Sequence, residues 1–117
     1  MHRDAPIIQK TYDFYKAFYA TVRLFPNEEK YAIGGKIKNT ILEILELLIE
    51  AGFRKTEKIP LLEKASIKLD SLKIFIRLTY EIKLINQKKY IQLEEPLQEI
   101  GRMLGGWIRS CKTHNPA

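Results

Sequence analysis

Apolar residues recur every three or four positions in four successive stretches of this chain, and this spacing excludes most folds. Side chains spaced in this way share one face of an α-helix, whereas a half-buried β-strand requires strict alternation. No stretch of the sequence shows strand-like alternation. We therefore expect an all-α protein with helices at about 6–24, 28–51, 60–85 and 87–110.

Residues typical of helix ends stand between these stretches. Asn27 and Asn86 are suitable N-cap residues, and Pro60 suits a first helical turn. Gly52 is expected at a helix C-terminus. The connections are short, so the expected architecture is an up-down-up-down antiparallel four-helix bundle, with residues 1–117 as one domain. Pro96 predicts a kink or a weak start near residues 92–96 of the last helix.

Each expected helix carries one stripe that we assign to the core. The members, helix by helix, are Ile8, Tyr12, Tyr15, Tyr19 and Val22; Ile33, Ile37, Ile41, Ile44 and Leu48; Leu62, Ala65, Leu69, Leu72, Ile76 and Thr79; and Tyr90, Leu93, Leu97, Ile100, Leu104, Trp107 and Cys111.

Two of the helices carry a second apolar stripe. In the third helix it lies roughly opposite the core stripe, and in the first helix it is offset by about a quarter turn. An exposed apolar stripe indicates self-association or a protein partner, although a broad core would also absorb the stripe of the first helix. Glycines in the last helix favour a close contact with another helix or subunit, or they mark fraying near its C-terminal end. The candidate oligomer interface is Ile7, Phe14, Phe18, Ile67, Ile74, Leu78, Ile85, Gly101 and Gly105.

The chain is basic, with 20 lysines and arginines against 14 acidic residues and a net charge of +6. Residues 27–59 are neutral overall, so the excess lies on the other three helices. Such a charge favours nucleic acid or an acidic partner, although lysine-rich surfaces also serve solubility alone. The candidate binding residues are Lys16, Arg23, Lys64, Lys68, Lys73, Arg77, Arg102 and Arg109.

The sequence shows no pattern typical of catalysis or metal binding. His2 and His114 have no ligand partner at helical spacing. Gly34-Gly35-Lys36 lacks the other residues of a phosphate-binding loop, and Cys111 has no histidine in a matching position. We therefore expect a protein without enzymatic activity, metal, cofactor or small-molecule substrate. The acidic face of Glu43, Glu46 and Glu50 is expected to be solvated and to pair with lysines.

The expected location is the cytoplasm. The apolar runs are far shorter than the roughly 18 residues of a membrane span, and the first residues do not resemble a signal peptide. A single cysteine excludes an intramolecular disulfide and fits a reducing compartment.

Three segments of the chain resemble one known family. They are Pro6-Ile7-Ile8-Gln9-Lys10-Thr11-Tyr12-Asp13-Phe14-Tyr15-Lys16, Leu45-Glu46-Leu47-Leu48-Ile49-Glu50-Ala51 and Glu99-Ile100-Gly101-Arg102-Met103-Leu104-Gly105-Gly106-Trp107-Ile108. They are similar to the accessory variability determinant (Avd) of diversity-generating retroelements, and the resemblance extends from Pro6 to Ile108. Pro96 departs from the expected pattern.

The resemblance implies a non-enzymatic partner of a reverse transcriptase. In this family a homopentameric barrel of four-helix bundles binds that enzyme and nucleic acid, template RNA or its cDNA, during mutagenic retrohoming. The alternative is a protein-only oligomeric scaffold, of the four-helix type encoded in ribosomal RNA intervening sequences. Both interpretations predict an oligomer, so nucleic-acid affinity is what separates them.

Overall fold

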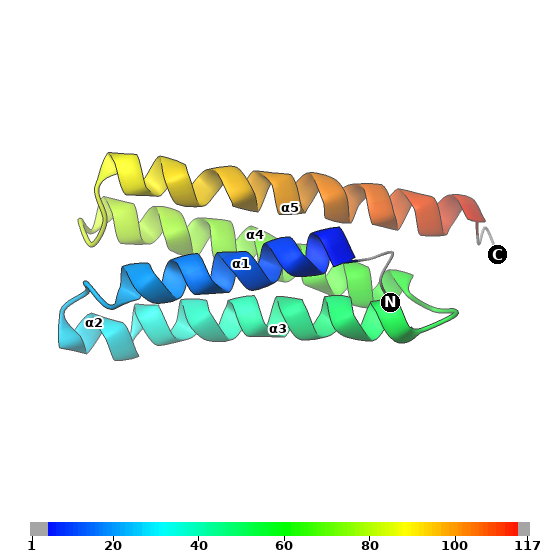
Figure 1. Cartoon of the computed structure of the whole chain (residues 1–117), viewed down its shortest axis with the longest axis horizontal. Coiled ribbons are helices and arrows are strands. Elements are labelled where there is room, and N and C mark those ends of the chain that lie inside the picture. The colour runs from blue at the N-terminus through cyan, green and yellow to red at the C-terminus, as the bar shows by residue number, and fades with distance from the viewer. Residues whose placement is uncertain (1–4, 115–117) are drawn as a thin grey trace.

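The computed structural model describes residues 5–114 and arranges four long helices and one short helix as an elongated bundle of 49 × 21 × 21 Å (Figure 1). The helices are α1 (Ala5–Val22), α2 (Asn27–Tyr31), α3 (Ile33–Phe53), α4 (Ile59–Glu81) and α5 (Gln87–His114). The described range contains no β-strand, so the all-α prediction is confirmed.

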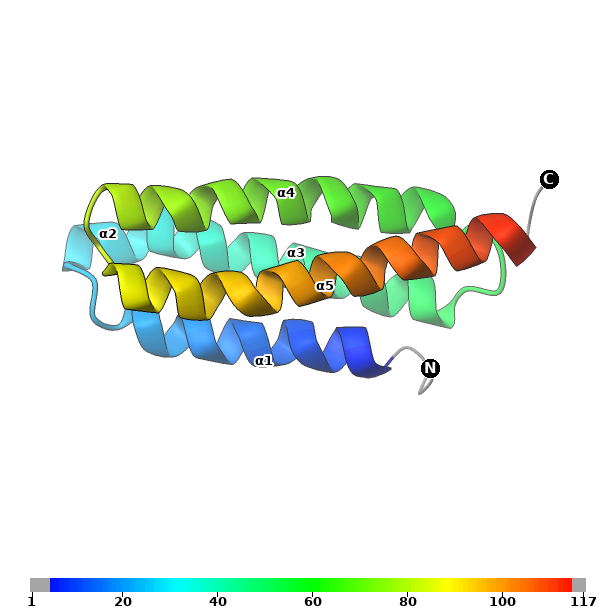
Figure 2. The same ribbon diagram turned by 90° about the horizontal axis from the view of Figure 1, so that it is seen from above.

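The four long helices form a closed square in cross-section. α1 packs against α3 and α5, and α4 packs against the same two helices (Figure 2). Each long helix therefore runs antiparallel to the next along the chain, as short connections require. This arrangement gives every helix two neighbours and leaves one outer face of each helix in contact with solvent.

The core consists mainly of isoleucine and leucine from α3, α4 and α5. The predicted stripes of these helices are confirmed, since Ile37, Ile41, Leu62, Leu97 and Ile100 are almost fully buried with their stripe neighbours. Only the residues at the stripe ends, Ile33, Tyr90, Trp107 and Cys111, are half-buried against the same core.

The predicted core stripe of α1 is wrong for Tyr12 and Tyr19, whereas its member Val22 is buried and Ile8 and Tyr15 are half-buried against the core. The buried residues are Ile7, Phe14, Phe18, Val22 and Phe25, whereas Tyr12 and Tyr19 are each 51% exposed. Ile7, Phe14 and Phe18 therefore lie in the core of the single chain and not at an oligomer interface. The reason is that phenylalanine and isoleucine bury no polar atom, whereas a buried tyrosine hydroxyl needs a hydrogen-bond partner.

The predicted second helix is divided near its start. The backbone at Ala32, with φ −91° and ψ −100°, interrupts it between α2 and α3, and Pro26 takes the N-cap position expected of Asn27. A Cβ atom on Gly34 would lie 2.5 Å from Val22 Cγ2 and 3.0 Å from the Glu29 carbonyl oxygen. Only glycine permits this close approach of α1 and α2 to α3.

The helix ends at Gly52 and at residue 85 also differ from the prediction. α3 continues through Gly52 to Phe53, and the extended backbone of Arg54 stops it. α4 ends at Glu81 because Lys83 adopts the left-handed conformation, with φ 69°. The Leu84 N–H then donates to the Thr79 carbonyl at 2.8 Å, and the Lys83 N–H donates to the Tyr80 carbonyl at 3.0 Å. This pair of bonds is a Schellman motif.

The predicted outward position of Ile85 is wrong because of this Schellman turn. Beyond the turn the chain no longer follows the α4 helix, so Ile85 enters the core and is 9% exposed instead of facing outward. Asn86 then caps α5 as predicted, since its side-chain oxygen accepts the Lys89 N–H at 2.8 Å. α5 is one continuous helix through Pro96.

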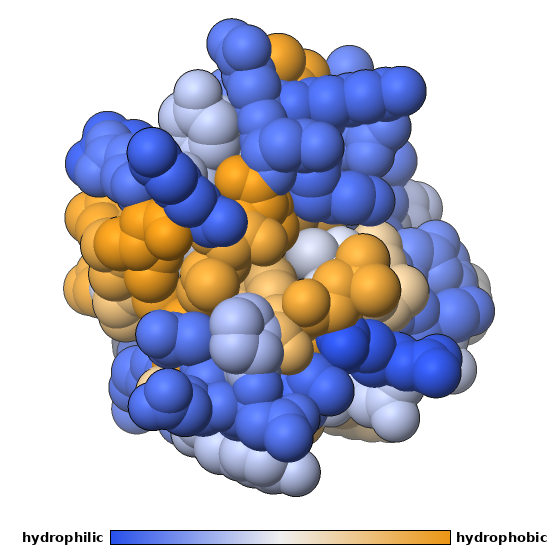
Figure 3. Space-filling model, turned by 90° about the vertical axis from the view of Figure 1, so that its left-hand side faces the viewer, coloured by the Kyte–Doolittle hydropathy of each residue, from blue (hydrophilic) through white to orange (hydrophobic). Residues whose placement is uncertain are grey.

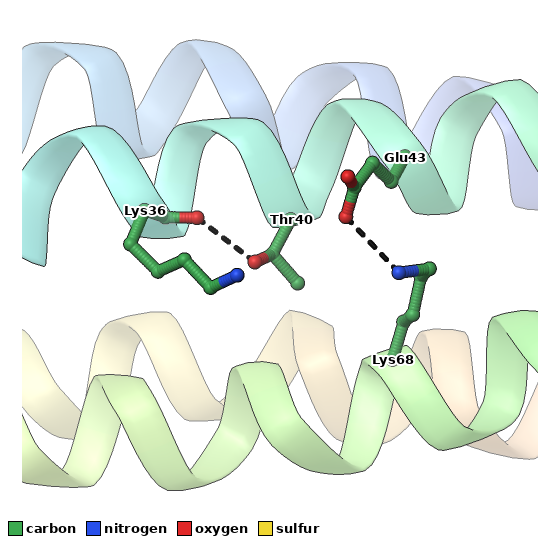
Figure 4. Close-up of polar contacts among 4 residues, drawn as sticks. All are labelled: Lys36, Thr40, Glu43 and Lys68. Carbon is green, nitrogen blue, oxygen red and sulfur yellow. Dashed lines mark hydrogen bonds and ion pairs between the residues drawn. The ribbon is translucent and has the colours of Figure 1, made fainter.

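The buried threonines satisfy their hydroxyl groups within their own helices. The Thr11 hydroxyl donates to the Ile7 carbonyl at 2.9 Å. The Thr40 hydroxyl likewise donates to the Lys36 carbonyl at 2.8 Å (Figure 4). These bonds offset the desolvation of the hydroxyl groups and allow threonine to stand in an otherwise apolar core.

Candidate nucleic-acid interface

The candidate basic residues are spread over three sides of the bundle. Lys16 lies on α1 and Arg23 just beyond it, Arg102 and Arg109 lie on α5, and α4 carries the remaining four, Lys64, Lys68, Lys73 and Arg77. Lys68 and Lys73 are half-buried, and the other six residues are exposed. The structure therefore does not bring all eight candidates into one cluster.

Three of the candidates pair with carboxylates. Lys68 on α4 forms a 3.1 Å ion pair with Glu43 on α3 (Figure 4). Arg77 lies 3.9 Å from Glu81, and Arg102 pairs with Glu99 one turn before it. These exposed pairs contribute little to stability, but each places a negative charge beside the positive one. A phosphate approaching these positions therefore meets a locally compensated field.

The groove between α3 and α4 has mixed charge. It is lined by Lys64, Lys68, Leu47 and the three glutamates of α3, which are Glu43, Glu46 and Glu50. The prediction that this acidic face pairs with lysines is confirmed for Glu43, whereas Glu50 pairs with an arginine, Arg54, at 2.9 Å. Three carboxylates beside two lysines make this groove unfavourable for a polyanion.

Gly101 lies against α4 of the same chain. A Cβ atom there would lie 3.3 Å from Lys73 Nζ and 3.6 Å from Leu69 Cδ2. At Gly105 the nearest atom is the Arg109 guanidinium of its own helix, at 3.4 Å. The close helix contact expected at these glycines thus occurs at Gly101, whereas Arg109 folds over Gly105.

Five candidates form no ion pair with a carboxylate among the described residues, and they are Lys16, Arg23, Lys64, Lys73 and Arg109. Lys16 Nζ lies 5.4 Å from the centre of the Tyr12 ring. Lys38 on α3, which is not one of the candidates, makes the same kind of contact: its Nζ lies 5.7 Å from the centre of the Tyr19 ring. Each of the two exposed tyrosines of α1 therefore has a lysine beside its ring, one from α1 and one from α3.

The sequence interpretation missed this tyrosine surface because it assigned Tyr12 and Tyr19 to the core. The signal that distinguishes the two α1 stripes is the side-chain type: one stripe is isoleucine and phenylalanine, and the other is rich in tyrosine. Tyrosine is enriched where one side of a ring is apolar and the other is wet.

The outward apolar residues of α4 are exposed as predicted. Ile67, Ile74 and Leu78 are 67%, 56% and 40% exposed, and we call them the outer stripe. The bundle end at the α1–α2 and α4–α5 turns shows a second apolar area with a hydrophilic rim (Figure 3). Leu24, which is 83% exposed, and Leu84 line a pocket there together with Lys88 and Lys89.

The surroundings of Tyr90 shift the pKa of its hydroxyl group. Burial raises its pKa above 10.0, and its hydroxyl donates a 3.0 Å hydrogen bond to Glu94, whose negative charge also disfavours the phenolate. The Tyr90 ring stacks on Tyr80 with 4.9 Å between ring centres. These contacts join α4 to α5 through a packed pair of aromatic rings.

Within the described part of the chain, no group of three or more histidine, cysteine or acidic residues is arranged so that it could hold a metal ion. Cys111 is a half-buried free thiol, and Gly34-Gly35-Lys36 lies inside α3. His2 and the side chain of His114 lie outside the described residues. None of the described helices is long and apolar enough to cross a membrane.

Comparison with known proteins gives a match to one family model. A family model described as bAvd-like matches residues 6–111, which include all five helices of the bundle almost completely. A search of curated proteins found no match.

Proposed function

Because the chain belongs to the bAvd-like family, we propose that it is an accessory protein of a diversity-generating retroelement. Its role is to bind the element's reverse transcriptase and the nucleic acid, template RNA or cDNA, during mutagenic retrohoming. The protein itself is not an enzyme, and the polymerase supplies the chemistry. The match over residues 6–111 is the observation that carries this proposal.

The charge distribution supports the nucleic-acid part of the proposal. One chain carries a net charge of only +6, which is too diffuse for tight binding by a monomer. A homopentamer repeats that excess about fivefold and can neutralise several phosphates at once. The exposed, unpaired residues Lys16, Arg23 and Arg109 lie outside the mixed-charge groove between α3 and α4 and are the best placed of the candidates to do so.

The outer stripe of α4 supports the oligomeric part. Ile67, Ile74 and Leu78 form an apolar line on a face that no helix of the same chain covers. Burying this line between subunits removes apolar area from water. We assign it to the subunit contact of the proposed pentamer.

A protein-only scaffold is the second candidate function. The apolar bundle end with its hydrophilic rim favours it, because such a surface suits a protein partner (Figure 3). This scaffold also oligomerises, but it has no salt-dependent affinity for nucleic acid. Affinity for RNA and DNA therefore decides between the two functions.

The experiment measures RNA and DNA binding as a function of salt concentration. Affinity is expected to fall steeply with salt, with a slope that reports the number of phosphate contacts. Lys16→Gln with Arg23→Gln should reduce the slope by about 1.4 for a single strand, at roughly 0.7 for each contact. The matched control is Arg77→Gln with Arg102→Gln, which removes two paired charges and should change the slope less.

Two results would contradict the nucleic-acid proposal. One is a wild-type protein that retains neither RNA nor DNA at low salt. The other is an equal, unchanged slope in both variants. Co-purification with the reverse transcriptase encoded by the same element tests the remaining part of the proposal.

A further inference from the structure

Three tyrosines follow one another along α1, and the last of them, Tyr19, contacts Lys38 of α3. Tyr12 and Tyr19 are each 51% exposed, and half-buried Tyr15 lies between them with its ring centre 6.3 Å from that of Tyr19. We call Tyr12, Tyr15 and Tyr19, together with Lys16 and Lys38, the tyrosine strip. α1 runs along the long axis of the bundle, so the strip follows that axis (Figure 1).

The lysines give the strip a positive charge. Lys16 lies over the Tyr12 ring and Lys38 over the Tyr19 ring, at 5.4 and 5.7 Å from the ring centres. Asp13 is the single acidic residue of α1, and Gln9 donates a 2.9 Å hydrogen bond to it. The first half of α3, residues 33–42, contains two glycines and two lysines but no acidic residue. Neither Lys16 nor Lys38 forms an ion pair with a described carboxylate, whereas Lys68 pairs with Glu43.

We propose that the tyrosine strip binds unpaired bases of single-stranded nucleic acid. Tyr12 and Tyr19 stack with bases, and Lys16 and Lys38 contact the adjoining phosphates. Aromatic platforms beside positive charges bind single strands without sequence preference, because every base has a flat face and every nucleotide has a phosphate. This inference rests on the proposed function, to which it adds the site and the kind of strand.

The spacing of the rings favours a single strand over a duplex. Tyr12 and Tyr19 are two helical turns apart, about 10.5 Å along α1. Successive bases in one strand of a duplex are only about 3.4 Å apart and already stack on each other. A strand must therefore be unstacked and extended to place bases on both rings. A duplex offers the strip only its phosphates.

The test uses the full chain with Tyr12→Leu and Tyr19→Leu together, which removes the flat rings without changing charge. The probes are fluorescent oligo-dT and oligo-rU of about 16 nucleotides, and a duplex of the same length. The variant should bind the single strands about 10-fold or more weakly and the duplex within about twofold of wild type. The salt slope should not change, because no charge is removed.

Two further variants test whether the effect depends on the aromatic rings at positions 12 and 19. Phe53→Leu is the matched control, since it removes a 70% exposed aromatic ring at the far end of α3 and should leave single-strand affinity unchanged. Tyr12→Trp with Tyr19→Trp keeps the stacking faces, so it should retain wild-type affinity and show fluorescence quenching when the single strand is added.

The outcomes separate this inference from the proposed function. If wild-type protein binds neither strand nor duplex, the nucleic-acid function fails and the inference fails with it. If wild type binds but the leucine variant binds single strands equally well, or loses strand and duplex affinity alike, only the tyrosine strip is excluded. A change of oligomer mass in the folded leucine variant would also overturn the inference, because it would place the rings in a subunit contact.

Discussion

The rings of Phe18 and Phe25 meet edge to face, with 6.1 Å between their centres and an angle of 84° between their planes. Phe18 lies inside α1 and Phe25 lies in the turn beyond its end, so the contact folds the turn back onto the helix. Both side chains are at most 3% exposed. This pair holds the phenylalanine face of α1 in the core and consequently leaves Tyr12 and Tyr19 on the outside.

Phe18→Ala should destabilise the fold by about 3–5 kcal/mol, because it removes a fully buried ring and leaves a cavity. The neighbouring change Tyr19→Leu should alter the free energy of unfolding by no more than about 0.5 kcal/mol, since that ring is half exposed. Urea unfolding of the two variants measures both values. Equal destabilisation would show that the two faces of α1 are buried to the same extent.

Gly34→Ala should destabilise the protein by about 1–3 kcal/mol, because the new Cβ atom meets Val22 Cγ2 and a backbone oxygen. Gly35→Ala is the matched control. Its Cβ atom has no neighbour closer than 3.8 Å, so alanine should stabilise α3 by about 0.5–1 kcal/mol. Thermal unfolding should therefore move the two melting temperatures in opposite directions. A Gly34→Ala variant as stable as wild type would refute the close packing.

Lys83→Gly should raise the free energy of unfolding by about 0.5–1 kcal/mol. The backbone at Lys83 is left-handed, with φ 69°, which strains any residue with a Cβ atom and suits glycine. Lys83→Ala, which removes the charge but keeps the strain, is the control and should not stabilise. Chemical denaturation measures the difference, and equal gains in both variants would assign the effect to charge.

Ile74→Lys together with Leu78→Lys should dissociate the proposed oligomer without loss of helix content. Both residues are exposed on the single chain, so the charges do not enter its core. Light scattering measures the mass and circular dichroism the helix content. A wild-type mass of 13.7 kDa at micromolar concentration would exclude self-association, and an unfolded variant would place these residues in the core.

Tyr90 should titrate above its ordinary pKa of 10.0 in an ultraviolet titration of the folded protein. The unfolded chain releases this proton near pH 10, while the folded chain retains it because burial and Glu94 disfavour the phenolate. The stabilising contribution is therefore present below pH 10 and is lost as the pH rises through the folded pKa. Tyr90→Phe should make the alkaline loss of stability shallower, and an unchanged pH profile would contradict this assignment.

The core-facing sides of α3, α4 and α5 follow from the sequence. In these helices the spacing of Ile37, Ile41, Leu62, Leu97 and Ile100 leaves one clear apolar stripe toward the core, and Asn86 marks the start of α5. Periodicity suffices for α3 and α5 because a single continuous stripe has only one way to be buried in a four-helix bundle. The exposed outer stripe of α4 is predictable because it lies opposite the core stripe, and opposite faces of a helix cannot both point at one core.

The tertiary structure alone decided which face of α1 is buried, where α4 ends and which basic residues remain unpaired. α1 has two apolar stripes about a quarter turn apart, so periodicity does not choose between them, and packing of Phe14, Phe18 and Phe25 does. Ile85 became buried through a left-handed turn at a lysine, which carries no sequence signal. Lys68 is neutralised by Glu43 from another helix, and the lysines beside Tyr12 and Tyr19 are not. Such pairings join residues far apart in the chain, and only the folded arrangement brings them together.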